Sequence, residues 1–325
     1  MPEELAATAP HPERHVALKV DVDTLRGTLE GVPALAALFA RLNVGATFYF
    51  SVGPDHTGRA LRRVFRRGFL SKVRRTSVTS HYGLATLLYG TLLPGPDIGA
   101  RAGAVMRAVR DQGFEVGLHS YDHVRWQDNV RAAGAAWTRR ELERGMDAFA
   151  GVFGAPPRSH AAAGWQLNAA ALALEPELGF EFASDTRGSC PFYPSLDGVE
   201  GRCLQIPTTL PTLDELIGLE GRDARAAAEE ILRITRVVPC AAHVFTLHAE
   251  LEGMRLLPQL EWLLGAWLED GCTPLAMGAL HARLTPREQP RHRVAMEEIP
   301  GRSGVLAVQG GCIAEPAEPP AAVSA

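Results

Sequence analysis

The chain has 325 residues, with 33 basic and 37 acidic side chains and a formal net charge of −4 at pH 7. With 46% hydrophobic and 22% charged residues, the composition is that of a folded globular protein, which excludes collagen-like, coiled-coil and wholly disordered chains. The near-neutral balance also argues against a general nucleic-acid binder, and we expect no nucleic-acid partner.

Strands and helices are predicted to alternate along most of the chain. Strands are expected where branched apolar residues cluster, over 16–22, 45–52, 114–118, 180–184, 204–207 and 243–247. Helices are expected where apolar residues recur at helical spacing, over 32–42, 98–110, 142–153, 168–174, 224–235 and 257–268. Repeated βα units favour a parallel sheet, either open or closed into a barrel.

Three segments fall outside this alternation, and they set the predicted domain limits. Residues 1–15 are predicted to be a disordered leader, 16–285 a catalytic domain, and 286–325 a disordered tail rich in Pro, Gly, Ala and Glu. Residues 59–96 are too many for an ordinary βα loop and are predicted to be an insertion in the domain.

The cysteines and the N-terminus favour a cytoplasmic protein. The chain has five cysteines and lacks a C-x-x-C pair, which argues against a disulfide framework and a cysteine zinc site. The first residues carry acids and prolines where an export signal needs a basic start and an apolar core. The longest apolar stretch, Tyr82 to Leu93, is far shorter than the ~20 residues of a membrane-spanning helix.

Two carboxylates stand at the end of the first predicted strand. Asp21 and Asp23 belong to the sequence KVDVDT, and residues i and i+2 of a strand project to the same side. Because α/β folds display catalytic groups at the carboxyl ends of their strands, the two acids could hold one ion or divide the roles of ligand and base. The alternative is a pair of solvated acids.

Two histidine pairs have the four-residue spacing that places two imidazoles on one helical face, within reach of one metal. His119 ends a predicted strand and is followed by His123, whereas His11 and His15 flank a proline and a glutamate near the N-terminus. Metal ligands of βα folds are expected at strand ends, so we predict His119 and His123 as ligands, and not the other pair.

A further predicted strand end carries His248, in the sequence HVFTLHAE. Three strand ends would then offer Asp, His and His to one face of the fold. One carboxylate and two imidazoles leave positions open for water and a substrate oxygen, as catalytic metal sites do. A remaining carboxylate and histidine would be available as base and acid. The alternative for His248 is a core histidine or a helix cap.

The order of these motifs resembles the polysaccharide deacetylase family with Nod-factor deacetylase homology. Asp-x-Asp comes first, His-Ser-x-x-His in the middle and Thr-Leu-His late, in a match that runs from about Val16 to Leu280. Within this family the chain resembles the 4-deoxy-4-formamido-L-arabinose-phosphoundecaprenol deformylases in the segments DVDTLRGTLEGVP, FSVGPDHTGR, EVGLHSYDH, AAAGW, SDTRG, PFYP, QIPTTLPTLDE and TLHAELEG. The resemblance implies a distorted (β/α) barrel and a metal-dependent amide hydrolase.

The resemblance also implies residue roles and a substrate. It makes Asp23, His119 and His123 the ligands of one divalent metal ion, with Asp21 as base and His248 as general acid. It implies removal of an N-formyl group, as formate, from a sugar phosphate on a polyprenyl lipid, in the addition of aminoarabinose to lipid A that confers polymyxin resistance. Manganese, zinc, cobalt and iron all suit these ligands.

Two positions depart from the wider family. Val22 separates the first acids where most members have adjacent aspartates, so the roles of base and ligand could be exchanged between Asp21 and Asp23. The third motif, AAAGW, lacks the arginine that orients the base in many members. Arg187 of SDTRG is our hypothetical replacement.

Three residues of these motifs, Trp165, Asp185 and Arg187, are predicted to lie around the substrate. Asp185 and Arg187 could equally form a surface ion pair.

The insertion contains a strongly basic segment, RALRRVFRRGFLSKVRR, and no acid occurs between Asp55 and Asp97. Its apolar residues recur at helical spacing beside the bases, the pattern of a helix lying on a membrane surface. We predict peripheral attachment to the inner membrane or binding of lipid phosphate through Arg59, Arg62, Arg63, Arg66, Arg67, Lys72, Arg74 and Arg75. The alternatives are a solvated basic helix and one that binds RNA.

Other functions stay open at this point. An acetyl group differs from formyl by one methyl, which gives only ~10–200-fold discrimination, so a sugar deacetylase is an alternative. A glycosyltransferase could use Asp21 and Asp23 to hold a metal and a nucleotide diphosphate, but would leave the histidines unexplained. A non-haem iron oxygenase shares the two-histidine, one-carboxylate set. A lipid-binding protein without activity would need only the basic insertion.

Overall fold

The computed structural model describes residues 14–60, 88–238, 242–285 and 288–313. Residues 1–13 of the predicted leader, and every base of the basic segment except Arg59, lie outside the described residues. The prediction of a disordered leader is wrong for its last two residues, Arg14 and His15, which begin strand β1 (Arg14–Val22).

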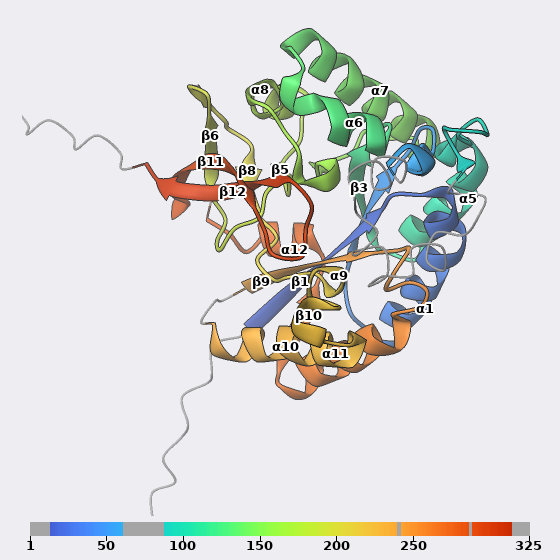
Figure 1. Ribbon diagram of the computed structural model, residues 1–325, viewed down its shortest axis with the longest axis vertical. Coiled ribbons are helices and arrows are strands. Elements are labelled where there is room, and N and C mark those ends of the chain that lie inside the picture. The colour runs from blue at the N-terminus through green and yellow to red at the C-terminus, as the bar shows by residue number, and fades with distance from the viewer. Residues whose placement is uncertain (1–13, 61–87, 239–241, 286–287, 314–325) are drawn as a thin grey trace, which may run out of the picture.

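A parallel sheet forms the centre of the molecule (Figure 1). Its strands follow the order β10-β1-β2-β3-β4-β5-β8, and β9 also pairs with β1. The strands are β1 (Arg14–Val22), β2 (Thr47–Ser51), β3 (Glu115–Ser120), β4 (Ser159–His160), β5 (Phe182–Ala183), β8 (Leu204–Gln205), β9 (Ala242–His248) and β10 (Cys272–Leu275). All these pairings are parallel, as the predicted βα alternation requires.

The sheet curves into a half barrel, which confirms the predicted fold class. Beyond β8, the chain turns toward β9, where the N–H groups of Thr209 and Leu210 both donate to the carbonyl of Val244 at 3.1 Å. These contacts draw the two ends of the sheet together without a regular pair of strands between them.

Helices cover the outside of the half barrel, with α1 and α5 on one flank, α10 and α11 below, and α6 to α8 above in the view of Figure 1. They are α1 (Val32–Leu42), α5 (Ile98–Asp111), α6 (His123–Asn129), α7 (Ala135–Phe153), α8 (Ala169–Glu177), α9 (Leu213–Leu216), α10 (Ala224–Val237), α11 (Leu257–Glu269) and α12 (Met277–His281). Side-chain caps fix several starts: Asp97, Asn168 and Asp223 each accept a hydrogen bond from the backbone N–H three residues on. No helix in the described residues is long and apolar enough to cross a membrane.

The alternation of β1 divides its side chains between the helices and the barrel interior. Leu18, Val20 and Val22 are buried in the main apolar core with the helices. Lys19 and Asp21 point the other way, because successive strand residues face opposite sides. The strand therefore delivers polar groups to the interior of the half barrel while its other face anchors it.

The prediction of a disordered tail from residue 286 is wrong for residues 291–312. These form β11 (Arg291–Glu298) and β12 (Val305–Cys312), which join β6 (Tyr193–Leu196) and β7 (Val199–Glu200) in a second sheet, ordered β12-β11-β6-β7. Val294 and Ala307 are buried in an apolar cluster with Phe192. Composition alone did not predict this hairpin, because a hairpin with few apolar residues can be stable when it pairs with a neighbouring strand and packs on an existing core.

Candidate active site

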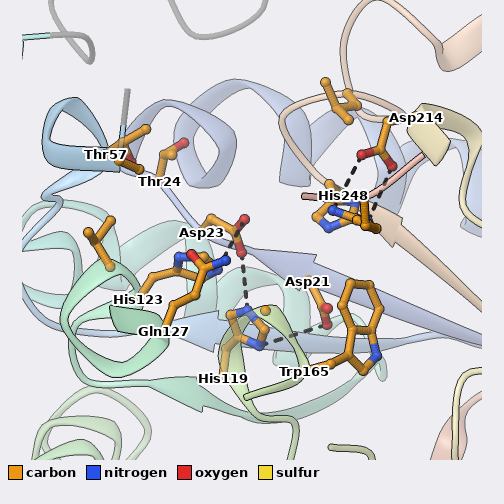
Figure 2. A pocket seen from close by; sticks show the side chains of 15 residues that line it. Asp21, Asp23, Thr24, Thr57, His119, His123, Gln127, Trp165, Asp214 and His248 are labelled. Atoms are coloured by element: carbon orange, nitrogen blue, oxygen red, sulfur yellow. Dashed lines mark hydrogen bonds and ion pairs between the residues drawn. The ribbon is translucent and has the colours of Figure 1, made fainter. Parts of the chain in front are cut away.

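Five predicted side chains converge at the carboxyl edge of the sheet, as Figure 2 shows. Asp21 lies at the end of β1 and Asp23 directly after it, His119 is in β3, His123 begins α6, and His248 ends β9. Neighbouring parallel strands end at the same edge, so residues distant in sequence meet there.

The set of Asp23, His119 and His123 has the geometry of a metal-binding group. One ligand atom from each lies within 4.8 Å of the others. His119 Nε2 is 3.2 Å from Asp23 Oδ1, and His123 Nε2 is 3.5 Å from Asp23 Oδ2. The four-residue spacing suggested that the two histidines share one face of a helix, but they do not. They meet because the chain turns from a strand into a helix between them.

The charges of this set are coupled. Burial raises the pKa of Asp23, but attraction to His123 and His119 outweighs it and leaves the pKa of this carboxyl well below its usual range. Burial lowers the pKa of His123, against the attraction of Asp23. Asp and His bind metals as the ionised carboxylate and the neutral imidazole, and these shifts favour those two forms in Asp23 and His123.

Asp122 fixes the position of His123 at the start of α6. It is the N-cap residue, and its Oδ1 accepts a hydrogen bond from the N–H of Arg125 at 3.0 Å. Its other oxygen lies 2.6 Å from Nδ1 of His56. The cap therefore defines where the helix begins and so where the imidazole of His123 projects.

Glu250 fixes the turn that carries Asp23. Its Oε1 accepts hydrogen bonds from the N–H of Asp23 at 3.0 Å and from the N–H and hydroxyl of Thr24, each at 2.8 Å. Burial and the nearby Asp23 raise the pKa of Glu250 to about 8. Gly27 makes room for it, since a Cβ there would lie 2.0 Å from Oε1 of Glu250.

His248 sits between acidic groups on the other side of the cavity. Burial lowers its pKa, but Asp214 and Asp23 outweigh this and the pKa is raised. Glu252 Oε2 accepts a hydrogen bond from the N–H of His248 at 2.7 Å. Arg302 Nη1 lies 3.4 Å from Asp214 Oδ2, which keeps that carboxylate ionised beside the histidine.

The prediction that Arg187 orients Asp21 is not supported by its contacts. Arg187 pairs with Glu215, and its other terminal nitrogen donates to the carbonyl of Leu210 at 3.0 Å. The cation next to Asp21 is Lys19, whose Nζ lies 3.7 Å from Asp21 Oδ2.

The alternative of a surface ion pair between Asp185 and Arg187 is also wrong, because both are buried and have different partners. Asp185 Oδ1 lies 3.1 Å from His160 Nδ1 and accepts a hydrogen bond from the N–H of Ala162 at 2.6 Å. Glu175 completes this buried cluster, with Oε1 3.6 Å from His160 Nδ1. Burial lowers the pKa of His160, but Asp185 and Glu175 outweigh it and bring it to about 9.

The converging side chains line a cavity of about 190 Å³. Besides the five predicted residues, its lining includes Trp165, Asp214, Arg302, Thr24, Thr57 and Gln127. Trp165 was predicted; Asp185 and Arg187 are not in this lining. Asp214 and Glu250 were not predicted as site residues, although both belong to segments that carry the family resemblance, QIPTTLPTLDE and TLHAELEG. Arg302 was not predicted either, because it falls in the segment predicted to be disordered.

The fold and site define a member of the polysaccharide deacetylase family. The sequence model of that family matches residues 8–183, and the chain belongs to it. Among solved structures, a candidate polysaccharide deacetylase from Mycobacterium smegmatis has the same fold, with a TM-score of 0.59 at 17% identity over 90% of this chain and 98% of its own. A peptidoglycan N-acetylglucosamine deacetylase has a TM-score of 0.51 at 13% identity, over 83% of this chain and 89% of its own.

Two relatives within the family have descriptions that name an activity and a substrate. A Shewanella sediminis protein described as a probable 4-deoxy-4-formamido-L-arabinose-phosphoundecaprenol deformylase is 37% identical over 300 residues, which are 92% of this chain and 95% of its own. A Wigglesworthia glossinidia brevipalpis protein with the same description is 32% identical, over 87% of this chain and 98% of its own.

Proposed function

We propose that this protein removes the N-formyl group from 4-deoxy-4-formamido-L-arabinose phosphoundecaprenol by hydrolysis, releasing formate and a free sugar amine. The near full-length similarity to proteins described as deformylases of this substrate carries the proposal. The convergence of three metal-binding side chains with a spare carboxylate and a spare histidine supports an amide hydrolysis at this site.

Asp23, His119 and His123 would hold one divalent metal ion, and their chemistry fits one. Buried Asp23 Oδ1 has no hydrogen-bond partner within the described part of the chain, and it lies 3.2 Å from His119 Nε2, the ring nitrogen on the side of this group. A bound ion supplies Lewis-acid polarisation of the amide carbonyl and acidifies water. One carboxylate and two imidazoles suit manganese, zinc or cobalt.

Asp21 and His248 would move the protons of the reaction. Asp21, whose Oδ1 lies 3.9 Å from His119 Nδ1, would accept the proton of the attacking water. His248, with a pKa raised by Asp214 and Asp23 against the effect of burial, would donate a proton to the departing amine. Trp165 forms a wall of the cavity beside His248, with the two ring centres 6.4 Å apart, and would contact the sugar. Arg187 would support this wall from behind, since its guanidinium lies 5.1 Å from the Trp165 ring centre. Asp185 would hold the segment that leads to Trp165, since its Oδ1 accepts a hydrogen bond from the N–H of Ala162.

The lipid-linked substrate would bring the protein to the cytoplasmic face of the inner membrane. The basic segment of residues 59–75 would bind anionic lipid or the substrate phosphate through its arginines and Lys72. Sedimentation with vesicles tests this: binding should rise with the fraction of anionic lipid and fall with salt. Equal binding to neutral and anionic vesicles would contradict it.

Within this proposal, the amine product would serve the transfer of aminoarabinose to lipid A and so polymyxin resistance. The alternative is a deacetylase of another N-acetylated sugar. Mass spectrometry of the formamido substrate and its N-acetyl analogue, each incubated with metal-loaded protein, separates the two. We expect loss of formyl at a rate ~10–200-fold above loss of acetyl. A faster loss of acetyl would favour the deacetylase.

A further inference from the structure

Lys19 is a lysine enclosed in the centre of the catalytic sheet. Its side chain has 0% exposure, and it stands on the same face of β1 as Asp21. Lys19 and Lys72 are the lysines of the chain, and all its other permanently basic side chains are arginine. The chain therefore uses a lysine at this position although it uses arginine at almost every other basic position.

The ammonium of Lys19 is anchored on one side and faces Asp21 on the other. Nζ donates to the carbonyl oxygen of Ser184, directly after β5, at 2.7 Å. It lies 3.7 Å from Asp21 Oδ2. The rings of Trp165 and Tyr49 enclose it, with centres 5.4 and 5.9 Å from Nζ. The carbonyl anchor and the two rings leave the ammonium little freedom to move.

Burying the charged ammonium of Lys19 is energetically unfavourable, which indicates that the charge has a functional role. Removing an ammonium from water is unfavourable unless a partner compensates, and an apolar side chain would fill the same space without that penalty. Burial lowers the pKa of Lys19, against the attraction of Asp21 and of a second acid, Asp185. The oxygens of Asp185 already accept hydrogen bonds from Ala162 and Gln205 and face His160. Asp21 is therefore the carboxylate with which Lys19 forms its ion pair.

The two oxygens of Asp21 have different surroundings. Oδ2 faces the ammonium, whereas Oδ1 lies on the side of His119 and has no hydrogen-bond partner in the described residues. A carboxylate held at one oxygen keeps its other oxygen in a fixed direction. Asp21 and His119 both line the cavity, so a fixed Asp21 carboxylate has a fixed orientation at the cavity wall (Figure 2).

We infer that Lys19 is a positioning residue: its ammonium, anchored on the carbonyl of Ser184, fixes the orientation of the Asp21 carboxylate for proton transfer from the reacting water. This inference rests on the proposed function, in which Asp21 is the base. Lys19 acts through Asp21 and does not touch the substrate, so it contributes to kcat and not to substrate or metal binding.

A double-mutant cycle tests the inference. Lys19→Met, Asp21→Asn, the double variant and Thr186→Val are compared with the parent chain on the formamido substrate, with metal affinity measured alongside. Thr186 is the matched control, because it is buried and its hydroxyl has no partner among the residues described. We expect Lys19→Met to lower kcat about 10- to 100-fold, with KM and Mn²⁺ affinity within about threefold. In the Asp21→Asn background the same change should cost less than about threefold.

Three results would overturn the inference. Lys19→Met with parent kcat shows that the ammonium is dispensable, and an equal loss in both backgrounds shows that it acts independently of Asp21. A loss of metal affinity matching the loss of kcat shows that it only supports the metal-binding group. Full activity of Asp21→Asn would instead refute the proposed base.

Whether the variants fold provides a second test of the coupling between Lys19 and Asp21. If Lys19→Met does not fold, Lys19→Gln replaces it, because the amide can still donate to Ser184. If neither folds, the double variant decides, because it leaves no unpaired carboxylate. Recovery of folding in the double variant supports the coupling of Lys19 to Asp21, and failure to fold overturns it.

Discussion

Asp21 and His248 lie opposite each other in the parallel register of β1 and β9. The proposed base and the proposed acid thus come from neighbouring strands at the same level of the sheet. Since β1 also pairs with β2 and β10, this level is fixed by the central strand of the fold. The placement of both proton-transfer groups therefore follows from strand register and needs no flexible loop.

Replacing His119 by alanine should weaken Mn²⁺ or Zn²⁺ binding by more than ~100-fold, because it removes one of three ligands and not merely a supporting contact. Isothermal titration after chelator treatment measures the loss. His15→Gln is the control, since His15 lies at the opposite end of β1 from the site and should leave metal affinity unchanged. Unaltered binding by His119→Ala would exclude this metal-binding group.

Gly27→Ala should displace Glu250 and disturb the turn that carries Asp23. The new Cβ would meet Oε1 of Glu250 at 2.0 Å, and that oxygen accepts the N–H of Asp23. We expect lower metal affinity together with a lower melting temperature.

The matched glycine substitution is Gly265→Ala in α11, where nothing lies within 4 Å of the added Cβ. It should raise stability by up to about 1 kcal/mol and leave metal affinity alone. Equal effects of the two alanines on metal binding would contradict the role given to Gly27.

Asp214→Asn should move the alkaline limb of the kcat profile to lower pH. Burial lowers the pKa of His248 and Asp214 is the leading influence that raises it, so the neutral amide lets the pKa fall. A general acid works only while protonated, so activity is then lost earlier as pH rises. Asp223→Asn, a capping change at the start of α10, should leave the profile in place. A shift of the limb to higher pH would refute His248 as the acid.

Stability should fall between about pH 6.5 and 9 because of His160. Its pKa is raised from 6.5 to about 9 in the folded protein, so the folded state retains a proton that the unfolded chain releases. The contribution is complete below pH 6.5 and lost as pH rises through 9, and it is on the order of 3 kcal/mol.

Melting curves of His160→Gln against pH check this expectation, and the variant should show a flatter decline. His281→Gln is the control because burial lowers the pKa of His281, so that it stays neutral over the same interval. A parent protein whose stability does not change between pH 7 and 9.5 would contradict the charged state given to His160.

Sequence patterns predicted the elements whose pattern is local. Val16 to Val22 and residues 32–42 have strong strand and helix periodicity, and β1 and α1 appear there. The catalytic edge could also be anticipated, because Asp21, His119 and His248 each end an apolar run.

Partnerships across the sheet could not be anticipated in this way. Lys19 and Ser184 are 165 residues apart, and nothing local announces that a lysine in a buried strand will donate to that carbonyl. Arg302 reaches the cavity from a hairpin whose composition is that of a disordered tail, because its stability comes from the sheet that it joins.

The most direct test of the account is a metal titration of chelator-stripped protein, with formate released from the formamido substrate as the readout. Activity should rise from near zero and reach its plateau at one equivalent of Mn²⁺ or Zn²⁺ in the parent protein. Asp21→Asn should bind the metal and release almost no formate. Full formate release by the stripped protein, or by metal-loaded Asp21→Asn, would contradict a hydrolase built on these five residues.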